Sequence, residues 1–209
     1  MINIVVIGGG GHAKVVISVL KKINDYRIYG YVSKENCGDI LGIPFLGGDE
    51  VLPDLVNSQH VQHAVIAVGA SVTGQARSEI AELICRLRFS FPTIVSPDSM
   101  ISCGVKLGEG VFVNDGASIG PDVKIDSFSI INRNSSVDHD SEIGKHVHIA
   151  PNATLAGGVI IGDYVQVGIG STIIENRKIA NKVIIGAGAV IIRDCAESTT
   201  YIGVPGRAK

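Results

Sequence analysis

The chain has 209 residues, of which 45% are hydrophobic and 18% are charged, a composition typical of one or two globular domains. It excludes a disordered or fibrous chain. Eighteen Lys and Arg against twenty Asp and Glu leave a net charge of −2, and no basic run indicates a nucleic acid or an anionic membrane as the partner. We therefore expect the partner to be a small molecule or another protein.

The N-terminal segment, residues 1–7, lacks the charged start of a signal peptide and reaches glycines too soon for a membrane span. This predicts a cytoplasmic protein. The cysteines are scattered and include no CxxC pair of the kind found in redox or zinc sites. We expect reduced thiols, most of them buried, and no metal. The cysteines are Cys37, Cys85, Cys103 and Cys195.

The first half of the chain alternates between strand and helix patterns. An apolar strand over 4–7 runs into four glycines and His12, and a helical stretch follows from Ala13 to about Ile23. Further strands are predicted over 28–32 and 64–68, and an apolar helical face follows around residues 80–87. This order predicts a small Rossmann-like βαβ domain over residues 1–93.

The glycine turn of this domain fits the dinucleotide fingerprint loosely, as Gly8-x-Gly10-x-x-Ala13. Backbone amides at a helix N-terminus can approach a diphosphate closely when glycines precede them. An NAD site also needs an acidic residue after the second strand, where this chain has Ser33 and Lys34. A nucleotide-activated substrate is therefore favoured over NAD, and a purely structural turn remains the alternative. His12 is either an exposed loop residue or a hydrogen-bond donor to a nucleotide.

The second half of the chain repeats with a period of six. From Val95 to Ile191 every sixth residue is aliphatic without an insertion, which makes seventeen hexads. Four positions later stands a small or β-branched residue, except at Arg177 and Cys195. One large and one small inward residue per hexad suit a narrow solenoid whose coils bury their aliphatic residues against each other. Prolines 92 and 97 mark the junction between the halves.

This repeat resembles that of the hexapeptide-repeat acyltransferases, which fold into a left-handed parallel β-helix with three hexads in each triangular coil. The resemblance, and not the spacing, implies the handedness, which is an exception to the right-handed crossover rule. It predicts a β-helix with a short C-terminal tail over residues 94–209.

Polar and ionisable residues crowd two successive hexads between residues 134 and 148. His139 follows the inward Val137 by two residues and should face outward at a turn. Asp138 and Asp140 flank it, and a carboxylate beside an imidazole orients the ring and raises its basicity, as a general base requires. His146 has no such neighbours, and we interpret it as a surface residue.

Four segments make the resemblance more specific. Their sequences resemble those of bacterial acetyltransferases that modify nucleotide-linked amino sugars, a group that also includes sialic-acid O-acetyltransferases. The similarity covers essentially the whole chain. The segments are Gly-Gly-Gly-His-Ala at 9–13, Asn-Ser-Ser-Val-Asp-His-Asp at 134–140, His-Ile-Ala-Pro-Asn-Ala-Thr-Leu-Ala-Gly-Gly-Val at 148–159 and Gly-Val-Pro-Gly-Arg at 203–207.

The resemblance implies roles for ten residues. His139 corresponds to the general base, and Asp140 to the acid that tunes it. The amide of Gly157 would face the thioester oxygen. The other matched positions line the acetyl-CoA site, at His148, Ile169 and Ala187, or hold the nucleotide sugar, at Gly10, Gly11, His12 and Gly69.

The chain departs from the family at two places. Members that use a UDP-sugar usually carry acidic residues where Ser33 and Lys34 stand. Arg177 occupies an inward small position, so either its hexad bulges or its side chain turns outward towards a CoA phosphate.

The function expected from these residues is acetyl transfer from acetyl-CoA to the amine of a nucleotide-linked amino-deoxy sugar, by a homotrimer whose active sites lie between subunits. Three alternatives remain at this stage. They are O-acetylation of a sialic acid or related sugar, a γ-type carbonic anhydrase with three histidines from two subunits around zinc, and a non-catalytic scaffold or nucleotide-sensing module.

Overall fold

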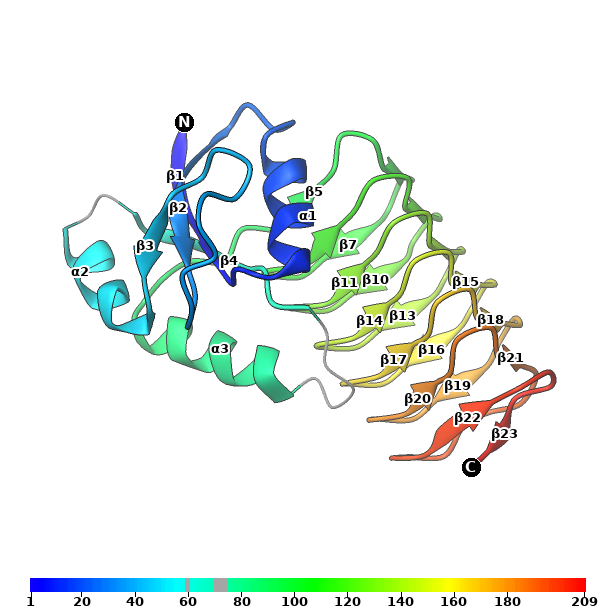
Figure 1. Ribbon diagram of the computed structural model, residues 1–209. Helices are drawn as coiled ribbons and strands as arrows, with labels where there is room; N and C mark the ends of the chain where they lie inside the picture. Colours follow the sequence, from blue (N-terminus) through cyan, green and yellow to red (C-terminus); the bar gives the residue numbers. More distant parts are fainter. Residues whose placement is uncertain (59–60, 70–74) are drawn as a thin grey trace. The chain divides into compact units, whose positions relative to one another are not determined.

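The computed structural model describes residues 1–58, 61–69 and 75–209, and these residues form two compact units that meet in sequence between Pro92 and Thr93 (Figure 1). We describe each unit by itself. Within the described part of the chain, no helix is both long and apolar enough to cross a membrane.

The first unit contains a four-stranded parallel sheet with the strand order β3-β2-β1-β4. Helix α1 contacts β1 and β2, and α3 contacts β4. The strands are β1 (Ile2–Ile7), β2 (Tyr26–Val32), β3 (Phe45–Gly47) and β4 (His63–Ile66), and the helices are α1 (Gly11–Leu20), the 3-10 turn η1 (Asp49–Val51), α2 (Leu52–Asn57) and α3 (Gln75–Arg86). Thus α1 begins two residues before the predicted helix and ends three residues before its predicted end.

The sheet reverses its strand order at β1. Strand β2 lies on one side of β1 and β4 on the other, so the C-terminal ends of β1 and β4 form the switch point at which such folds bind ligands. Gly8 adopts φ +128°, and a Cβ there would lie 2.8 Å from the carbonyl oxygen of Ala67. A glycine is therefore required where these two chain segments approach each other.

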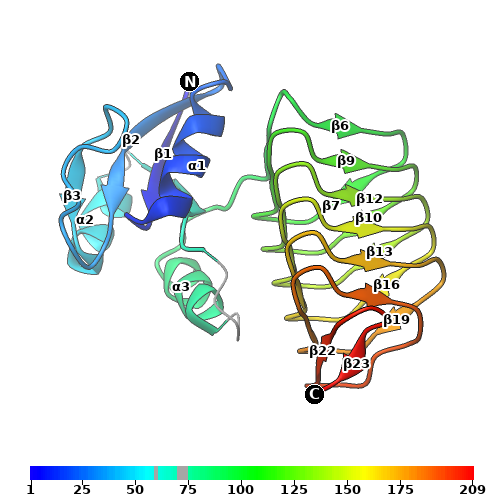
Figure 2. The ribbon, with the colours of Figure 1, turned by 45° about the vertical axis from the view of Figure 1, so that its right-hand side comes forward.

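The second unit is a parallel β-helix with three stacked sheets (Figure 2). The first sheet contains β5 (Ile94–Val95), β8 (Phe112–Val113), β11 (Ile130–Ile131), β14 (His148–Ile149), β17 (Gln166–Val167), β20 (Ile184–Ile185), β22 (Thr200–Ile202) and β23 (Arg207–Ala208). The second contains β6 (Met100–Ile101), β9 (Ser118–Ile119), β12 (Ser136–Val137), β15 (Thr154–Leu155), β18 (Thr172–Ile173) and β21 (Val190–Ile191). The third contains β7 (Lys106–Leu107), β10 (Lys124–Ile125), β13 (Glu142–Ile143), β16 (Ile160–Ile161) and β19 (Lys178–Ile179).

Three corners join the sheets in every coil. In the coil of His139, the first corner (132–135) leads into the second sheet, the second corner (138–141) into the third sheet, and the third corner (144–147) back into the first. From Gly104 to Gly188, the third residue of each corner is in the left-handed region, as at Asn134 and Asp140 with φ 54° and 59°. Equivalent residues lie eighteen positions apart, because Val137 pairs with Leu155.

The aliphatic hexad residues form the core of the β-helix, as predicted. Val137, Leu155 and Ile173 are completely buried, and small corner residues such as Ala153 belong to the same buried cluster. Ile101 departs from this pattern and is partly exposed, because it belongs to the first coil and has a β-helix neighbour on one side only. At the other end, β22 pairs with β20 and then turns back into the antiparallel strand β23.

Arg177 does not produce a bulge. The following residues, Lys178 and Ile179, pair in register with β16, so the coil continues unchanged. The Arg177 side chain turns outward, where its Nε donates to the Glu175 carbonyl and its guanidinium lies 3.7 Å from the Asp194 carboxylate. The outward direction of Arg177 is therefore observed, and its contact with a CoA phosphate stays a prediction.

The expectation that most cysteines are buried is wrong. Cys37, Cys85 and Cys103 are exposed, and only Cys195 is buried. The three exposed thiols lie on a loop, a helix surface and a β-helix corner, outside the inward positions of the repeat. Cys195 occupies an inward small position, where burial, with a smaller contribution from Asp194, raises the pKa of its thiol to about 11.

Candidate active site

His139 is held by the geometry of the second corner. The side-chain oxygen of Asp138 accepts the backbone N–H of His139 at 2.7 Å, which secures the start of the turn. Asp140 then takes the left-handed conformation, with φ 59°. The His139 side chain consequently lies on the outside of the coil and is exposed to solvent.

Two carboxylates act on the imidazole of His139. Asp140 orients the ring, and the charges of Asp138 and Asp140 both favour its protonated form. Its Nδ1 donates to Oδ2 of Asp140 at 2.8 Å. This hydrogen bond and the negative charges of Asp138 and Asp140 raise the pKa of His139 above its ordinary value. With Nδ1 carrying a hydrogen, Nε2 is the nitrogen that can accept a proton from a substrate.

Gly157 lies directly under the His139 ring, one coil further along. A Cβ on Gly157 would be 2.5 Å from Cε1 and 2.6 Å from Nε2 of that ring. The next amide, that of Gly158, donates to the His139 carbonyl at 2.8 Å. The absence of a side chain at Gly157 therefore allows the imidazole to rest against the coil below it.

The backbone N–H groups of Gly157, Ile169 and Ala187 have no hydrogen-bond acceptor among the described residues. At several other corners a side-chain oxygen of the first residue accepts the next amide, as at Asp138 and Asn132. The three amides instead follow an alanine or a glycine, which has no side-chain oxygen. They remain available to carbonyl oxygens of a ligand.

The remaining predicted acetyl-CoA residues do not lie beside His139 within one chain. Ile169 and Ala187 occupy the first corner of successive coils, and His148 lies on the first sheet. The second sheet separates the first corner from the second. Ile169 is 59% exposed, so the first corner presents an open surface of its own.

Asn132 and Asn114 are polar neighbours of His148 that the sequence reasoning missed. Nδ2 of Asn132 lies 3.1 Å from Nε2 of His148, and Nδ2 of Asn114 donates to Oδ1 of Asn132 at 2.9 Å. The available signal was the eighteen-residue spacing of two asparagines at the same corner position, which places them one coil apart.

The four predicted nucleotide-sugar residues gather at the switch point of the first unit. Gly10 is the N-cap of α1, and a Cβ on Gly10 or Gly11 would meet no atom within 4 Å, so this helix end is open. A Cβ on Gly69, just beyond β4, would lie 3.7 Å from Cβ of His12. The ends of β1 and β4 therefore bring these residues together.

Arg77 supports the same edge of the sheet and was also missed. It is 4% exposed, and its guanidinium donates to the carbonyls of Ile66 at 3.1 Å and Val68 at 2.8 Å. Burial lowers the pKa of Arg77 to about 10, so it stays charged at neutral pH. The sequence did contain a signal for its burial, because Arg77 lies one helical turn before the buried Ala81 on the apolar side of α3.

His146, which we interpreted as a surface residue, is half-buried by its aromatic neighbours. Its ring is stacked between Phe128 and Tyr164, with ring centroids 5.1 Å and 5.0 Å away. The three rings occupy one position of the third corner in successive coils, on the other side of the third sheet from His139.

Among the described residues, no cluster of three His, Cys, Asp or Glu side chains could hold a metal ion.

The comparisons with known proteins agree with this architecture. Residues 3–84 match the family described as the PglD N-terminal domain. PerB, the perosamine N-acetyltransferase of Caulobacter crescentus solved with CoA and GDP-perosamine, is 35% identical, with a TM-score of 0.92 over 99% of this chain and 97% of that chain. A search of curated protein sequences found no match.

Two further structures share the fold. The acetyltransferase domain of PglB from Neisseria gonorrhoeae is 28% identical, with a TM-score of 0.93 over 99% of both chains. WeeI from Acinetobacter baumannii is 23% identical, with a TM-score of 0.88 over 100% of both chains. The chain belongs to the hexapeptide-repeat acetyltransferases. Its second unit is their left-handed parallel β-helix, so the predicted fold class is confirmed.

Proposed function

We propose that the protein transfers the acetyl group of acetyl-CoA to the amine of a nucleotide-linked amino-deoxy sugar in the cytoplasm. The observation that carries this proposal is the His139–Asp140 pair lying against Gly157, whose amide is available to a ligand. The similarity to PerB, which was solved with CoA and GDP-perosamine, supports the substrate class.

In this reaction His139 acts as the general base. Its Nε2 accepts a proton from the sugar amine as the amine nitrogen attacks the thioester carbon, and Asp140 stabilises the resulting imidazolium through Nδ1. The amide of Gly157 donates to the oxyanion that forms. Collapse of this intermediate breaks the C–S bond, and the imidazolium returns its proton to the leaving thiolate.

The acetyl-CoA site contains His148, Ile169 and Ala187 in this proposal. The open amides of Ile169 and Ala187 suit the amide carbonyls of the pantetheine arm. These residues lie at and near the first corner, whereas His139 lies at the second. A complete site therefore takes its base from one subunit and its first corner from another, and a homotrimer supplies this pairing three times.

The sugar nucleotide binds at the switch point of the first unit. Gly10, Gly11, His12 and Gly69 surround the open N-terminus of α1, where backbone amides and the helix dipole favour a diphosphate. Ser33 and Lys34 follow β2 in place of the acidic residue that holds an NAD ribose. This arrangement supports a nucleotide sugar over NAD.

The test measures thiol release from acetyl-CoA with UDP-, dTDP- and GDP-linked 4-amino sugars beside a free sialic acid. We expect turnover with at least one of the amino sugars and none with the sugar acid. Turnover with the acid alone would assign O-acetylation instead. Binding of a nucleotide sugar without thiol release from any acceptor would remove the transferase assignment.

A further inference from the structure

A chain of hydrogen bonds runs along the first corner of the β-helix and ends at His148. Asn114 is 1% exposed and donates through Nδ2 to Oδ1 of Asn132 at 2.9 Å. Nδ2 of Asn132 in turn lies 3.1 Å from Nε2 of His148. The two asparagines occupy one corner position in successive coils, so the repeat itself aligns them.

Backbone amides fix which end of each side-chain amide faces the next residue. The N–H of Asp115 donates to Oδ1 of Asn114 at 2.8 Å, and the N–H of Arg133 donates to Oδ1 of Asn132 at 2.8 Å. A backbone N–H can only donate, so the atom facing it must be the oxygen. The nitrogen of Asn114 therefore faces Asn132, and the nitrogen of Asn132 faces His148.

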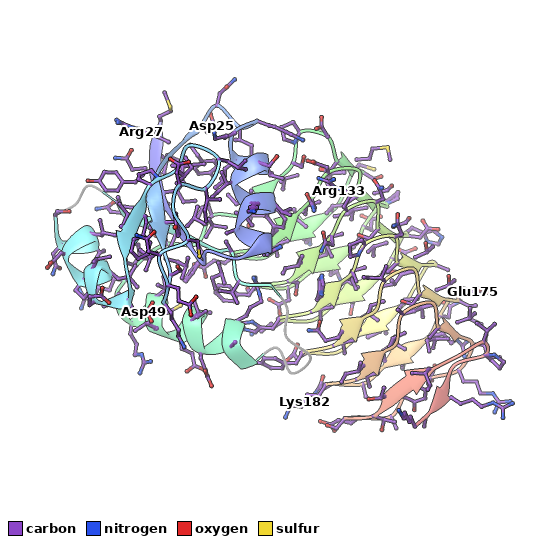
Figure 3. The ribbon with its side chains drawn as sticks, viewed as in Figure 1. Asp25, Arg27, Asp49, Arg133, Glu175 and Lys182 are labelled. Carbon is purple, nitrogen blue, oxygen red and sulfur yellow. The ribbon has the colours of Figure 1, made fainter. Side chains whose placement is uncertain are left out.

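The backbone donors are themselves held in place. Arg133 is labelled on the β-helix in Figure 3. Its guanidinium forms an ion pair with the Asp115 carboxylate at 3.1 Å across the same two coils. The hydroxyl of Ser96 donates to the other oxygen of Asp115 at 2.6 Å. Rotating either asparagine amide by 180° would set two donors against each other at its backbone contact, which costs a buried hydrogen bond.

From this network we infer that Asn114 and Asn132 hold His148 as the neutral tautomer with its hydrogen on Nδ1, so that His148 meets acetyl-CoA as a hydrogen-bond donor. An amide nitrogen has no lone pair to offer, so Nε2 must accept the hydrogen from Asn132. Protonation of Nε2 would place two donors 3.1 Å apart. The role towards acetyl-CoA rests on the proposed function, whereas the tautomer rests on the network alone.

The neighbours of His139 and His148 thus give the two rings different hydrogen-bonding roles. Both carry a hydrogen on Nδ1. In His139 that hydrogen is given to Asp140, which leaves Nε2 to act as a base. In His148 the neighbour occupies Nε2 instead, so Nδ1 is the nitrogen that carries the hydrogen. Asn114 and Asn132 are positioning residues for this donor.

The first measurement is made on the wild-type protein without acetyl-CoA. Long-range proton–nitrogen NMR at neutral pH reports which nitrogen of each imidazole is protonated, and the signals that vanish in His148→Gln belong to His148. We expect a protonated Nδ1 and an unprotonated Nε2. A hydrogen on Nε2, or on both nitrogens, would overturn the inference, whatever the enzyme acetylates.

The second measurement uses Asn132→Asp, which keeps the shape of the side chain. One carboxylate oxygen can still accept from Arg133 and Asn114, but the other now faces Nε2 of His148 as an acceptor. We expect the hydrogen to appear on Nε2 and the dissociation constant of acetyl-CoA to rise about tenfold, the effect of one hydrogen bond. The dissociation constant of the sugar nucleotide should not change.

The matched control is Asn181→Asp. Asn181 is exposed at the third corner and also accepts a backbone N–H through Oδ1, from Asp163 at 2.9 Å. The control adds the same charge without touching His148, so both the tautomer and the affinity for acetyl-CoA should stay as in the wild type. An unchanged tautomer in Asn132→Asp would contradict the inference. If Asn132→Asp does not fold, the wild-type spectrum decides.

Discussion

The two carboxylates beside His139 do different work, although they are neighbours in sequence. Asp138 accepts a backbone N–H and so stabilises the corner, whereas Asp140 accepts the imidazole N–H and so orients the His139 ring. The sequence indicated that both were near the ring, but their division of roles depends on the left-handed backbone of Asp140. Residues of the same type thus serve the fold and the reaction separately.

Replacing Asp140 by Asn should shift the pH dependence of the enzyme. The carboxylate raises the pKa of His139, so its removal lowers that pKa, and the base stays unprotonated to lower pH. We expect the acidic limb of kcat/KM to move to lower pH and kcat/KM to fall about tenfold at the optimum, since ring orientation and basicity are weakened. A limb that stays in place or moves to higher pH would contradict the assignment.

Asp138→Asn is the matched control for this profile. Its Oδ1 can still accept the backbone N–H of His139, and the bond between His139 and Asp140 is retained. Only the electrostatic contribution of Asp138 to the raised pKa is lost. The limb should therefore move in the same direction by a smaller amount, with little loss at the optimum.

Gly157→Ala should damage catalysis far more than stability. The backbone of Gly157 is not in the left-handed region, so alanine is compatible with it, but the new Cβ would lie 2.5 Å from the His139 ring. The exposed ring can move away at small cost, and a displacement of about 1 Å costs roughly 10²-fold in rate. We expect that loss in kcat/KM with a nearly unchanged melting temperature. An unchanged kcat/KM would contradict this prediction, because it would show that activity does not depend on the position of the His139 ring.

At the scale of elements, the six-residue period predicted the β-helix because it places one large residue inward in every strand. The period carries no information on handedness, which came from the resemblance, or on the direction in which Arg177 leaves its coil. Contacts between coils, such as those of Asn114 with Asn132 and of Gly157 with His139, appear only once an eighteen-residue register is known. The proposed site depends on these contacts, so the sequence predicted its central residues but not the residues that support them.

The core of the β-helix should be sensitive at every inward strand position. Leu155 is 0% exposed between Val137 and Ile173 in the coils above and below, and its replacement by Ala should lower the free energy of unfolding by about 2–5 kcal/mol. Ile160→Ala is the control, because Ile160 faces outward and is 41% exposed. Denaturant unfolding should show a much smaller loss there, and equal losses would contradict the stacked-coil account of stability.

At the scale of the whole molecule, the proposed reaction needs more than one copy of the chain. The base is at the second corner and the open amides of Ile169 and Ala187 are at the first, on opposite edges of the second sheet. In the proposed assembly, the second corner of one copy and the first corner of another copy together form one site. This proposal would account for the separation of His139 from Ile169 and Ala187 within one chain.

Complementation between two inactive variants tests this arrangement. His139→Ala removes the base, and Ala187→Trp blocks the first corner, so each variant alone should be inactive. In mixed assemblies, some sites combine the intact base of one variant with the intact corner of the other. Random mixing of equal amounts should restore roughly a quarter of the wild-type sites. No recovery of thiol release after co-expression would place the whole site within one chain.

The central claim is that His139 takes the proton from the acceptor amine, and the most direct measurement compares His139→Ala with His146→Ala. Both remove one outward histidine from neighbouring corners, but the His139 ring is hydrogen-bonded to Asp140, whereas the His146 ring is stacked between Phe128 and Tyr164. We predict that kcat/KM on the nucleotide amino sugar falls by about 10² to 10⁴ in His139→Ala and stays near the wild-type value in His146→Ala, with acetyl-CoA binding retained in both. Near-wild-type turnover in His139→Ala, or an equal loss in His146→Ala, would contradict the account.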